Sequence, residues 1–319
     1  MKDLSFLGVD ISKDSITVYD GKKLYTFPNE RYLKKFKERI FKRLNKEKTV
    51  IIYEPTGPYS SFLEEFAAVE RIKVVAINPR KTPYLLEVMS HRAKTDALDA
   101  KALYEYAKLI DKKDIRTVDL DDDLEELSFL LAEYRFIKKQ RVNFINHLES
   151  IKHNPKSDKE GKDHIESIVL QLNERLKSIE KKVKKLIEKK DKIKETVKKI
   201  ESINGIGFLT AANLFLFFEK KQVKNRKEAA ALIGLDPIVY ESGKKKINKR
   251  ISKQGDAYIR HLVYMAGMCA IRTNDTIKEF FERLVSDGKK KKVALVACMR
   301  KLLIAALAQY KNAYLEKTH

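Results

Sequence analysis

The chain has 319 residues, of which 43% are hydrophobic, and its formal net charge is +22. This apolar content excludes a globally disordered chain, and the length predicts two or three domains. The excess of positive charge points to a polyanionic partner, and residues 201–319 carry roughly +12 of it. A general preference for surface lysine would give the same excess. We find no signal peptide or apolar run of spanning length, and therefore expect a cytoplasmic protein without a membrane partner.

Residues 1–120 predict a mixed sheet with helices on its faces. Strands are expected at 4–9, 15–20 and 23–27, with an Asp-Gly turn between the second and the third. Helices and strands then alternate: a helix at about 30–45, a strand at 49–53, a helix at 59–69, a strand at 74–77 and a helix ending near 109. An antiparallel hairpin that leads into right-handed crossovers is the element order of the ribonuclease-H-like α/β fold.

Residues 121–200 predict long helices. Apolar residues repeat in alternating steps of four and three from Ile165 to Ile200, and Lys190 is the only polar position of this heptad series. A polar loop near 154–161 separates this series from an earlier apolar-periodic helix at 124–148. We expect the two helices to pack on each other and to form a coiled coil with a second copy. A helical hairpin within one chain is the alternative.

Residues 201–319 predict a mostly helical domain. Gly205 and Gly207 precede a helix, as in a helix-hairpin-helix element whose backbone amides meet a DNA phosphate, although a plain turn between helices has the same pattern. Four further helices are expected at 226–233, 256–272, 275–286 and 291–313. Their apolar positions place six residues in the core, the two cysteines as buried free thiols: Met265, Met268, Leu295, Leu302, Cys269 and Cys298.

A short stretch around Ser242 combines a hydroxyl, a glycine and a run of lysines. Glycine permits close backbone approach and lysine neutralises phosphate, so the stretch suits attack on a phosphate. An ordinary solvated hairpin turn has the same composition. Arg260 and His261 follow nearby, without an assigned role. The basic side chains expected to hold a nucleic-acid backbone are Lys244, Lys245, Lys246, Lys249, Arg250 and Lys253.

Four carboxylates are spaced as a metal site requires. Asp10 ends the first predicted strand, Glu54 ends the strand expected beside it, and Asp96 and Asp99 share one face of a helix. In a ribonuclease-H-like arrangement the four meet at one edge of the sheet. Hard oxygen ligands suit Mg²⁺ or Mn²⁺. Taken singly, each acid is more commonly a helix cap or a solvated side chain.

The acidic motifs resemble those of the DEDD transposases, which are encoded by the insertion-sequence family now called bridge-RNA-guided recombinases. The resemblance covers essentially the whole chain, and its specificity comes from the order in which the motifs occur. The N-terminal motifs are Gly8–Lys13, Tyr53–Gly57 and Lys94–Ala100. The C-terminal motifs are Ile203–Gly207, Ile233–Pro237, Glu241–Lys244 and Ile251–Asp256 with Ile259 and Arg260.

This resemblance implies a transposase of three domains: a resolvase-like nuclease domain at 1–120, a coiled-coil oligomerisation segment at 121–200 and a transposase domain at 201–319. It implies that Asp10, Glu54, Asp96 and Asp99 bind Mg²⁺, and that Ser242 forms a transient phosphoserine link to DNA. It further implies a homodimer or homotetramer, a structured guide RNA that pairs with element ends and target DNA, and an association with the nucleoid.

Three other interpretations remain open on the sequence. One is a junction-type endonuclease that uses metal-activated water without a covalent intermediate. A second is a tyrosine nucleophile, because Tyr240 and Tyr258 flank the serine. The third is a non-catalytic nucleic-acid-binding scaffold with a coiled-coil dimer.

Overall fold

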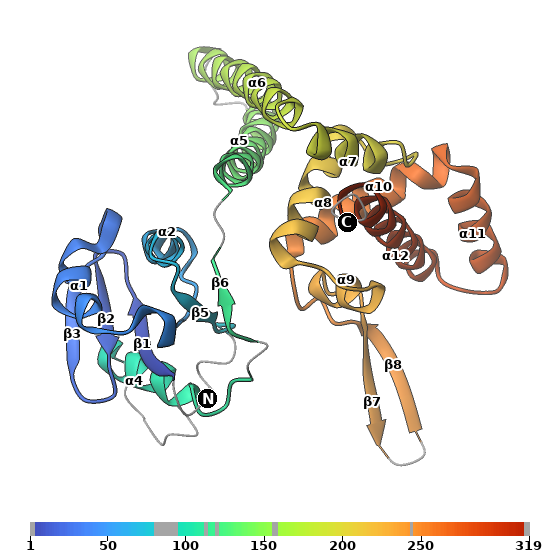
Figure 1. The fold of residues 1–319 in the computed structure, drawn as a ribbon. Helices are drawn as coiled ribbons and strands as arrows, with labels where there is room; N and C mark the ends of the chain where they lie inside the picture. Colours follow the sequence, from blue (N-terminus) through green and yellow to red (C-terminus); the bar gives the residue numbers. More distant parts are fainter. Residues whose placement is uncertain are drawn as a thin grey trace. The chain divides into compact units, whose positions relative to one another are not determined.

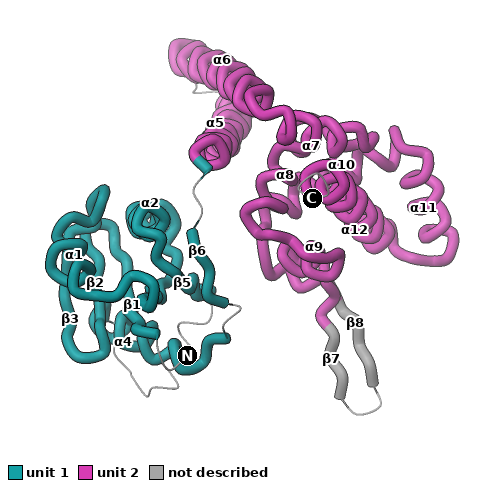
Figure 2. The backbone as a smooth tube through the Cα atoms, in the orientation of Figure 1, with its two compact units in different colours: residues 1–121 teal, residues 122–319 magenta. Residues whose placement is uncertain are grey.

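The computed structural model describes residues 4–79, 95–111, 114–118, 121–154, 159–242 and 245–315 (Figure 1). Within these ranges the side chains of residues 239–249 lie outside the description. The chain forms two compact units, Met1–Asp121 (unit 1) and Asp122–His319 (unit 2), shown in two colours in Figure 2. The long helices that follow residue 121 belong to the second unit.

Unit 1 contains a six-stranded mixed sheet in the order β3-β2-β1-β4-β5-β6. β1 pairs antiparallel with β2 and parallel with β4, and β5 continues the parallel part. The mixed sheet predicted from the sequence is therefore confirmed. β6 is an addition, because two residues are too few to give a periodic pattern. The strands are β1 (Ser5–Ile11), β2 (Ser15–Tyr19), β3 (Leu24–Pro28), β4 (Thr49–Tyr53), β5 (Lys73–Ala76) and β6 (Arg116–Thr117).

Helices cover both faces of this sheet. α1 (Lys34–Arg39) and α2 (Ser61–Val69) pack on the face that includes Leu7 and Val9. α4 (Asp96–Tyr106) packs on the opposite face, where Leu103 joins Val50, Ile52 and Val75 in a second core. Because side chains alternate along a strand, Gly8 and Asp10 face α4.

The continuous helix predicted at 30–45 is wrong. Tyr32 and Leu33 have φ values of 68° and 42°, and a right-handed helix cannot continue through such residues. The segment forms 3₁₀ turns on either side of the short α1 instead. The 3₁₀ turns of unit 1 are η1 (Arg31–Leu33), η2 (Phe41–Arg43), η3 (Lys46–Lys48) and η4 (Gly57–Ser60).

Unit 2 is mostly helical, as predicted, with one β-hairpin made of β7 and β8. The last helix continues into a π-helical turn, Lys311–Leu315. The elements are α5 (Asp122–Lys152), α6 (Lys159–Glu188), α7 (Asp191–Glu201), α8 (Phe208–Lys221), α9 (Arg226–Leu232), β7 (Pro237–Ser242), β8 (Lys245–Ile251), α10 (Ala257–Thr273), α11 (Asp275–Ser286) and α12 (Lys291–Tyr310).

The long helices α5 and α6 pack side by side (Figure 1). The Arg175 guanidinium Nε donates to Glu133 Oε1 across the pair at 3.0 Å. The heptad series does not form one continuous helix. α6 ends at Glu188 and α7 begins at Asp191, so the helix is interrupted at Lys190, the one polar position of the series. There Lys190 pairs with Asp123 at 3.0 Å. Packing on a second copy remains a prediction.

Several residues expected in the core of unit 2 lie on its surface. Leu295, Leu302 and Cys298 are buried as predicted. Cys269 is exposed, and Met265 and Met268 are 52% and 40% exposed, so their assignment to the core was wrong. Helical periodicity identifies an apolar face without showing that anything covers it.

The segment Lys291–Leu315 is long and apolar enough to span a membrane by length and composition, contrary to our expectation from the sequence. Half of the most apolar 18-residue stretch of this segment is buried inside the protein. Its buried side chains, including Met299 and Leu303, belong to the core shared with α10. These contacts are those of a core helix.

Candidate functional site

Two of the predicted acidic residues lie on neighbouring parallel strands. Val9 of β1 is in register with Tyr53 of β4. Asp10 is the next residue of β1, near its carboxyl end, and Glu54 directly follows the last residue of β4. Asp10 is partly buried between β4 and β2, where it pairs with Thr17. The sheet therefore places these two carboxylates side by side at the carboxyl end of its two central strands.

Helix α4 brings the other two carboxylates to this end of the sheet. It packs against β1 at Gly8, where a Cβ atom would lie 2.1 Å from the Ala100 carbonyl oxygen and 2.6 Å from the Tyr104 nitrogen. Only glycine allows so close an approach of a strand to a helix backbone. Asp96 and Asp99 lie in the turn that precedes this contact, and Asp99 is 7% exposed. No pattern in the sequence around Gly8 indicates this role.

The four carboxylates interact electrostatically. Burial, followed by the charges of Asp99, Asp96 and Glu54, raises the pKa of Asp10 from 3.8 to about 6, against the lowering effect of a backbone hydrogen bond at Ile11. A proton or a divalent cation relieves such repulsion. The hard oxygen donors fit Mg²⁺ or Mn²⁺ by their chemistry. As the described residues are placed, however, no three acidic, histidine or cysteine side chains come close enough together to chelate an ion.

The predicted serine lies at the end of a β-hairpin in unit 2. β7 and β8 pair antiparallel, and Ser242 is in register with Lys245. This is the hairpin that the composition of the stretch also allowed. Lys244 lies outside the described residues, as do the side chains of Ser242, Lys245, Lys246 and Lys249. Arg250 and Lys253 are described and are exposed.

The base of this hairpin is held by two interlocking glycine turns. Gly234 has φ +66°, and a Cβ there would lie 2.6 Å from the Gln254 oxygen. Gly255 has φ +124°, and a Cβ there would lie 2.2 Å from the Leu232 oxygen. The motifs at 233–237 and 251–256, which the sequence analysis treated separately, thus pack directly against each other.

Polar contacts reinforce the same base. The Ser252 hydroxyl donates to Asp236 Oδ1 at 2.6 Å, and the Ser252 amide donates to the Asp236 carbonyl at 2.8 Å. The Arg260 guanidinium donates through Nη1 to the Ile233 carbonyl at 2.8 Å. We assign Arg260 a role in fixing the base of the hairpin, which the sequence alone did not assign.

The glycines of the proposed helix-hairpin-helix element differ in their surroundings. Gly205 has φ +104°, and a Cβ there would lie 2.6 Å from the Ala270 Cβ, so this turn packs tightly on α10. Gly207 precedes α8 and has open space around it. Gly205 therefore has a packing role of its own, and contact of either glycine with nucleic acid remains a prediction.

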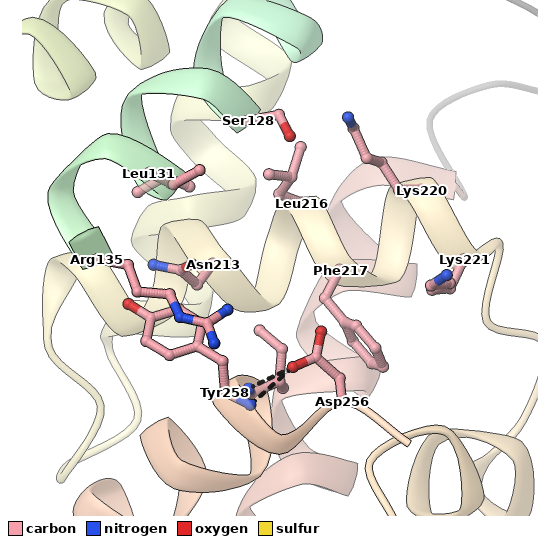
Figure 3. Close-up of a pocket in the computed structure, with 12 residues that line it drawn as sticks. Ser128, Leu131, Arg135, Asn213, Leu216, Phe217, Lys220, Lys221, Asp256 and Tyr258 are labelled. Atoms are coloured by element: carbon pink, nitrogen blue, oxygen red, sulfur yellow. Dashed lines mark hydrogen bonds between the residues drawn. The ribbon is translucent and has the colours of Figure 1, made fainter. Parts of the chain in front are cut away.

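A cavity of about 190 Å³ lies between α5, α8 and the start of α10 (Figure 3). Within it the Arg135 guanidinium lies over the Tyr258 ring, with its Cζ atom 4.3 Å from the ring centroid. Asp256 caps α10 by accepting from the Tyr258 and Ile259 amides. Burial raises the pKa of Tyr258. A half-buried phenol with a raised pKa is a poor nucleophile, which disfavours Tyr258 as the attacking group.

Comparison with known families gives two matches that follow this division. Residues 7–151 match a family model of the DEDD IS110 type, described as a transposase. Residues 197–282 match the model described as the transposase IS116/IS110/IS902 family. The chain therefore contains regions that match both domain models of the IS110/IS116-type transposases. The first match contains all four carboxylates, and the second contains Ser242 and the base of its hairpin.

Curated relatives match most of the length of this chain. A pilin gene-inverting protein of Moraxella bovis is 24% identical over 262 residues, which cover 81% of this chain and 79% of the relative. The transposase for insertion sequence element IS1111A of Coxiella burnetii is 25% identical over 311 residues, with 85% and 79% covered.

Proposed function

We propose that this transposase cuts and rejoins DNA through a covalent link between Ser242 and a DNA phosphate, assisted by a divalent cation at Asp10, Glu54, Asp96 and Asp99. The observation that carries the metal part is the placement of Asp10 and Glu54 at the carboxyl ends of neighbouring parallel strands, with α4 packed closely against β1 beside them. Burial, together with the charges of Asp99, Asp96 and Glu54, raises the pKa of Asp10 in agreement with this placement. The serine part rests on the position of Ser242 at the end of a hairpin whose base is rigidly packed.

The proposed chemistry divides between the two units. Mg²⁺ or Mn²⁺ would polarise a phosphate oxygen and neutralise developing charge. The serine hydroxyl loses its proton to solvent and its oxygen bonds to phosphorus. The bond from phosphorus to the adjacent nucleotide oxygen breaks, and that oxygen takes a proton from solvent to become a free hydroxyl. Reversal rejoins a strand, so the exchange needs no external energy. The lysine-rich hairpin, with Lys244, Lys245, Lys246, Lys249, Arg250 and Lys253, would neutralise the DNA backbone.

The remaining expectations are part of the same proposal. Unit 1 is proposed to be ribonuclease-H-like, which is supported by its hairpin, its parallel strands and the helices on both faces. The segment 121–200 is proposed to join copies of the chain into a dimer or tetramer. A structured RNA is proposed to choose the element ends and target, and the protein to act in the cytoplasm at the nucleoid. The names of the relatives, a transposase and a gene-inverting protein, support DNA exchange.

A junction-type endonuclease that uses metal-activated water is the second candidate. One observation favours it: all four carboxylates belong to unit 1, so the acidic cluster is complete without any residue of the serine hairpin. In that case Ser242 would have no chemical role.

An exchange assay separates the two candidates. The full-length protein is incubated with the element's terminal DNA, the RNA transcribed from the element's flank, and Mg²⁺. We expect Asp10→Ala and Ser242→Ala each to abolish strand exchange, because each removes a group that the proposed step requires. Glu38→Ala is the matched control, because it removes an exposed carboxylate from α1, the helix that packs on the sheet face opposite α4. Cleavage that survives Ser242→Ala would contradict the serine mechanism and support the endonuclease.

A further inference from the structure

A second and larger cavity lies beside the base of the serine hairpin. Its volume is about 450 Å³, and it is bounded by the end of β8, the first half of α10 and the first half of α12. Small-molecule sites are on the order of 300–1,000 Å³, so this cavity is large enough for one organic group. Leu295 and Met299, both buried, form part of its apolar floor.

The wall of this cavity is basic. Lys253, Arg260, His261 and Lys292 line it, and no carboxylate is among the described residues around it. Lys253 has φ +53°, a conformation that non-glycine residues rarely adopt, and its amide donates to the Gly234 carbonyl at 3.1 Å. Arg260 is held by the Ile233 carbonyl. The interlocked base of the hairpin therefore fixes the backbone of Lys253 and the guanidinium of Arg260 at the cavity wall.

An exposed aromatic ring borders the same cavity. Tyr264 lines it and is 42% exposed, and Met265 and Met268 continue the exposed apolar surface along α10. These methionines have no covering element in the described part of unit 2. A partly exposed ring beside positive charges is the combination with which proteins bind single-stranded nucleic acid, since bases stack on the ring and phosphates meet the charges.

We propose that this cavity binds an unpaired nucleotide of a DNA or RNA strand, with its base against Tyr264 above the apolar floor and its phosphate near Lys253 and Lys292. A base inside a duplex is stacked and paired and cannot enter such a cavity without flipping out. The site therefore selects single strands. This inference rests on the proposed function, because strand exchange is what would supply an unpaired nucleotide beside the serine hairpin.

Binding of labelled oligonucleotides tests this proposal. The full-length protein is titrated into a fluorescent single-stranded oligothymidylate and into a duplex of equal length, both in EDTA. We expect Tyr264→Leu to weaken single-strand binding about fivefold to a hundredfold, the range for losing one base–aromatic stack, and to leave duplex binding unchanged. Tyr32→Leu, which removes a 53% exposed ring in unit 1, is the matched control.

A charge variant tests the phosphate contact. Lys292→Gln is expected to weaken single-strand binding more than Lys289→Gln, which removes the same charge from an exposed position three residues earlier, outside the cavity. Tyr264→Trp is expected to retain binding, because the indole ring stacks as well as the phenol. Equal losses in the two lysine variants would mean that the contribution is general charge, and the proposal would be wrong.

A stacking probe gives an independent readout. A 2-aminopurine base in the single strand is expected to lose fluorescence on binding to the wild type and to keep it with Tyr264→Leu. If Tyr264→Leu instead changes only the oligomeric mass, the surface is a protein interface and the proposal is overturned. Since EDTA prevents the metal-dependent steps, a failed exchange assay would leave a positive binding result standing, and the two proposals fail separately.

Discussion

The four carboxylates of unit 1 lie at the carboxyl end of the parallel strands of a sheet that is covered on both faces, whereas Ser242 is the last residue of β7 in the hairpin of unit 2. The register of two buried strands and the close approach of α4 hold the carboxylates in place. The contacts that hold the hairpin, which are the glycine turns and the hydrogen bonds of Ser252 and Arg260, all lie at its base. The geometry of the acidic cluster therefore depends on the core of unit 1. The position of the serine depends instead on a few contacts among residues 232–260.

Gly8→Ala tests the first half of this comparison and has the largest expected effect on stability. The new methyl group would overlap the Ala100 carbonyl and force α4 away from β1. We expect a loss of about 1–3 kcal/mol or more, as for other overpacked cores. Amide hydrogen exchange of unit 1 peptides measures it, with Ser5→Ala, at an exposed position of the same strand, as the control. Unchanged protection of α4 would contradict the role assigned to Gly8.

Asp10→Asn tests whether the cluster stores electrostatic repulsion. The folded-state pKa of Asp10 is raised from 3.8 to about 6, so the stability of unit 1 falls as pH rises through this window. Above pH 6 in EDTA, the neutral variant should be more stable by about 1–2 kcal/mol, because solvent screening of this partly exposed carboxylate reduces the full value of 1.36 kcal/mol per pKa unit. Urea unfolding read on unit 1 peptides at several pH values measures this.

The same experiment has two internal checks. The advantage of Asp10→Asn should disappear below about pH 4, where the wild-type carboxyl is protonated in both states. Mg²⁺ should stabilise the wild type more than the variant, since the ion relieves the same repulsion. Glu38→Gln should show neither effect. A variant less stable than the wild type at neutral pH would show that Asp10 makes favourable contacts that outweigh the repulsion.

Ser252→Ala tests the second half of the comparison. The substitution removes the hydrogen bond to the Asp236 carboxylate at the base of the hairpin. Hydrogen bonds to charged groups contribute about 1.5–3 kcal/mol, and partial exposure should bring the loss to the lower end of this range. Faster amide exchange in β8, with unit 1 unchanged, is the expected result. Ser286→Ala, at an exposed site in α11, is the control. If β8 keeps its protection, the glycine turns alone hold the hairpin.

Glu133→Gln has the smallest expected effect and concerns the helices outside both sites. It breaks the ion pair with Arg175 across α5 and α6, in which both side chains are partly exposed. Exposed pairs contribute about 0.2–1 kcal/mol and are screened by salt. Thermal unfolding at low and high salt should show a small loss that salt removes. A loss larger than this would mean that the α5–α6 pair depends on this contact more than on its apolar seam.

Local pattern predicted most elements, because apolar runs that end in polar residues mark strands and helical periodicity marks helices. α11, for example, has the predicted bounds, Asp275–Ser286. Pattern failed where a single backbone conformation decides, as at Tyr32 and Leu33, or where two residues form a strand, as in β6. It also failed at Met265 and Met268, since periodicity shows which residues share a face and not what covers them.

The candidate site shows the same limit. Strand order allowed the sequence to bring Asp10 and Glu54 together, because the carboxyl ends of neighbouring parallel strands share an edge. The sequence could not reveal that Gly8 sets the distance of α4, or that Gly234 and Gly255 pack across the hairpin base. Those contacts join residues far apart in the chain, and a glycine carries no local sign of what approaches it.

The most direct test of the central claim is to identify the residue that becomes linked to DNA. The reaction with terminal DNA, RNA and Mg²⁺ is stopped with denaturant, the DNA is digested, and the peptides are mapped by mass spectrometry. The account predicts a nucleotide attached to Ser242, absent from Ser242→Ala and Asp10→Ala. Cleaved DNA without any adduct, or an adduct on Tyr240, would contradict it.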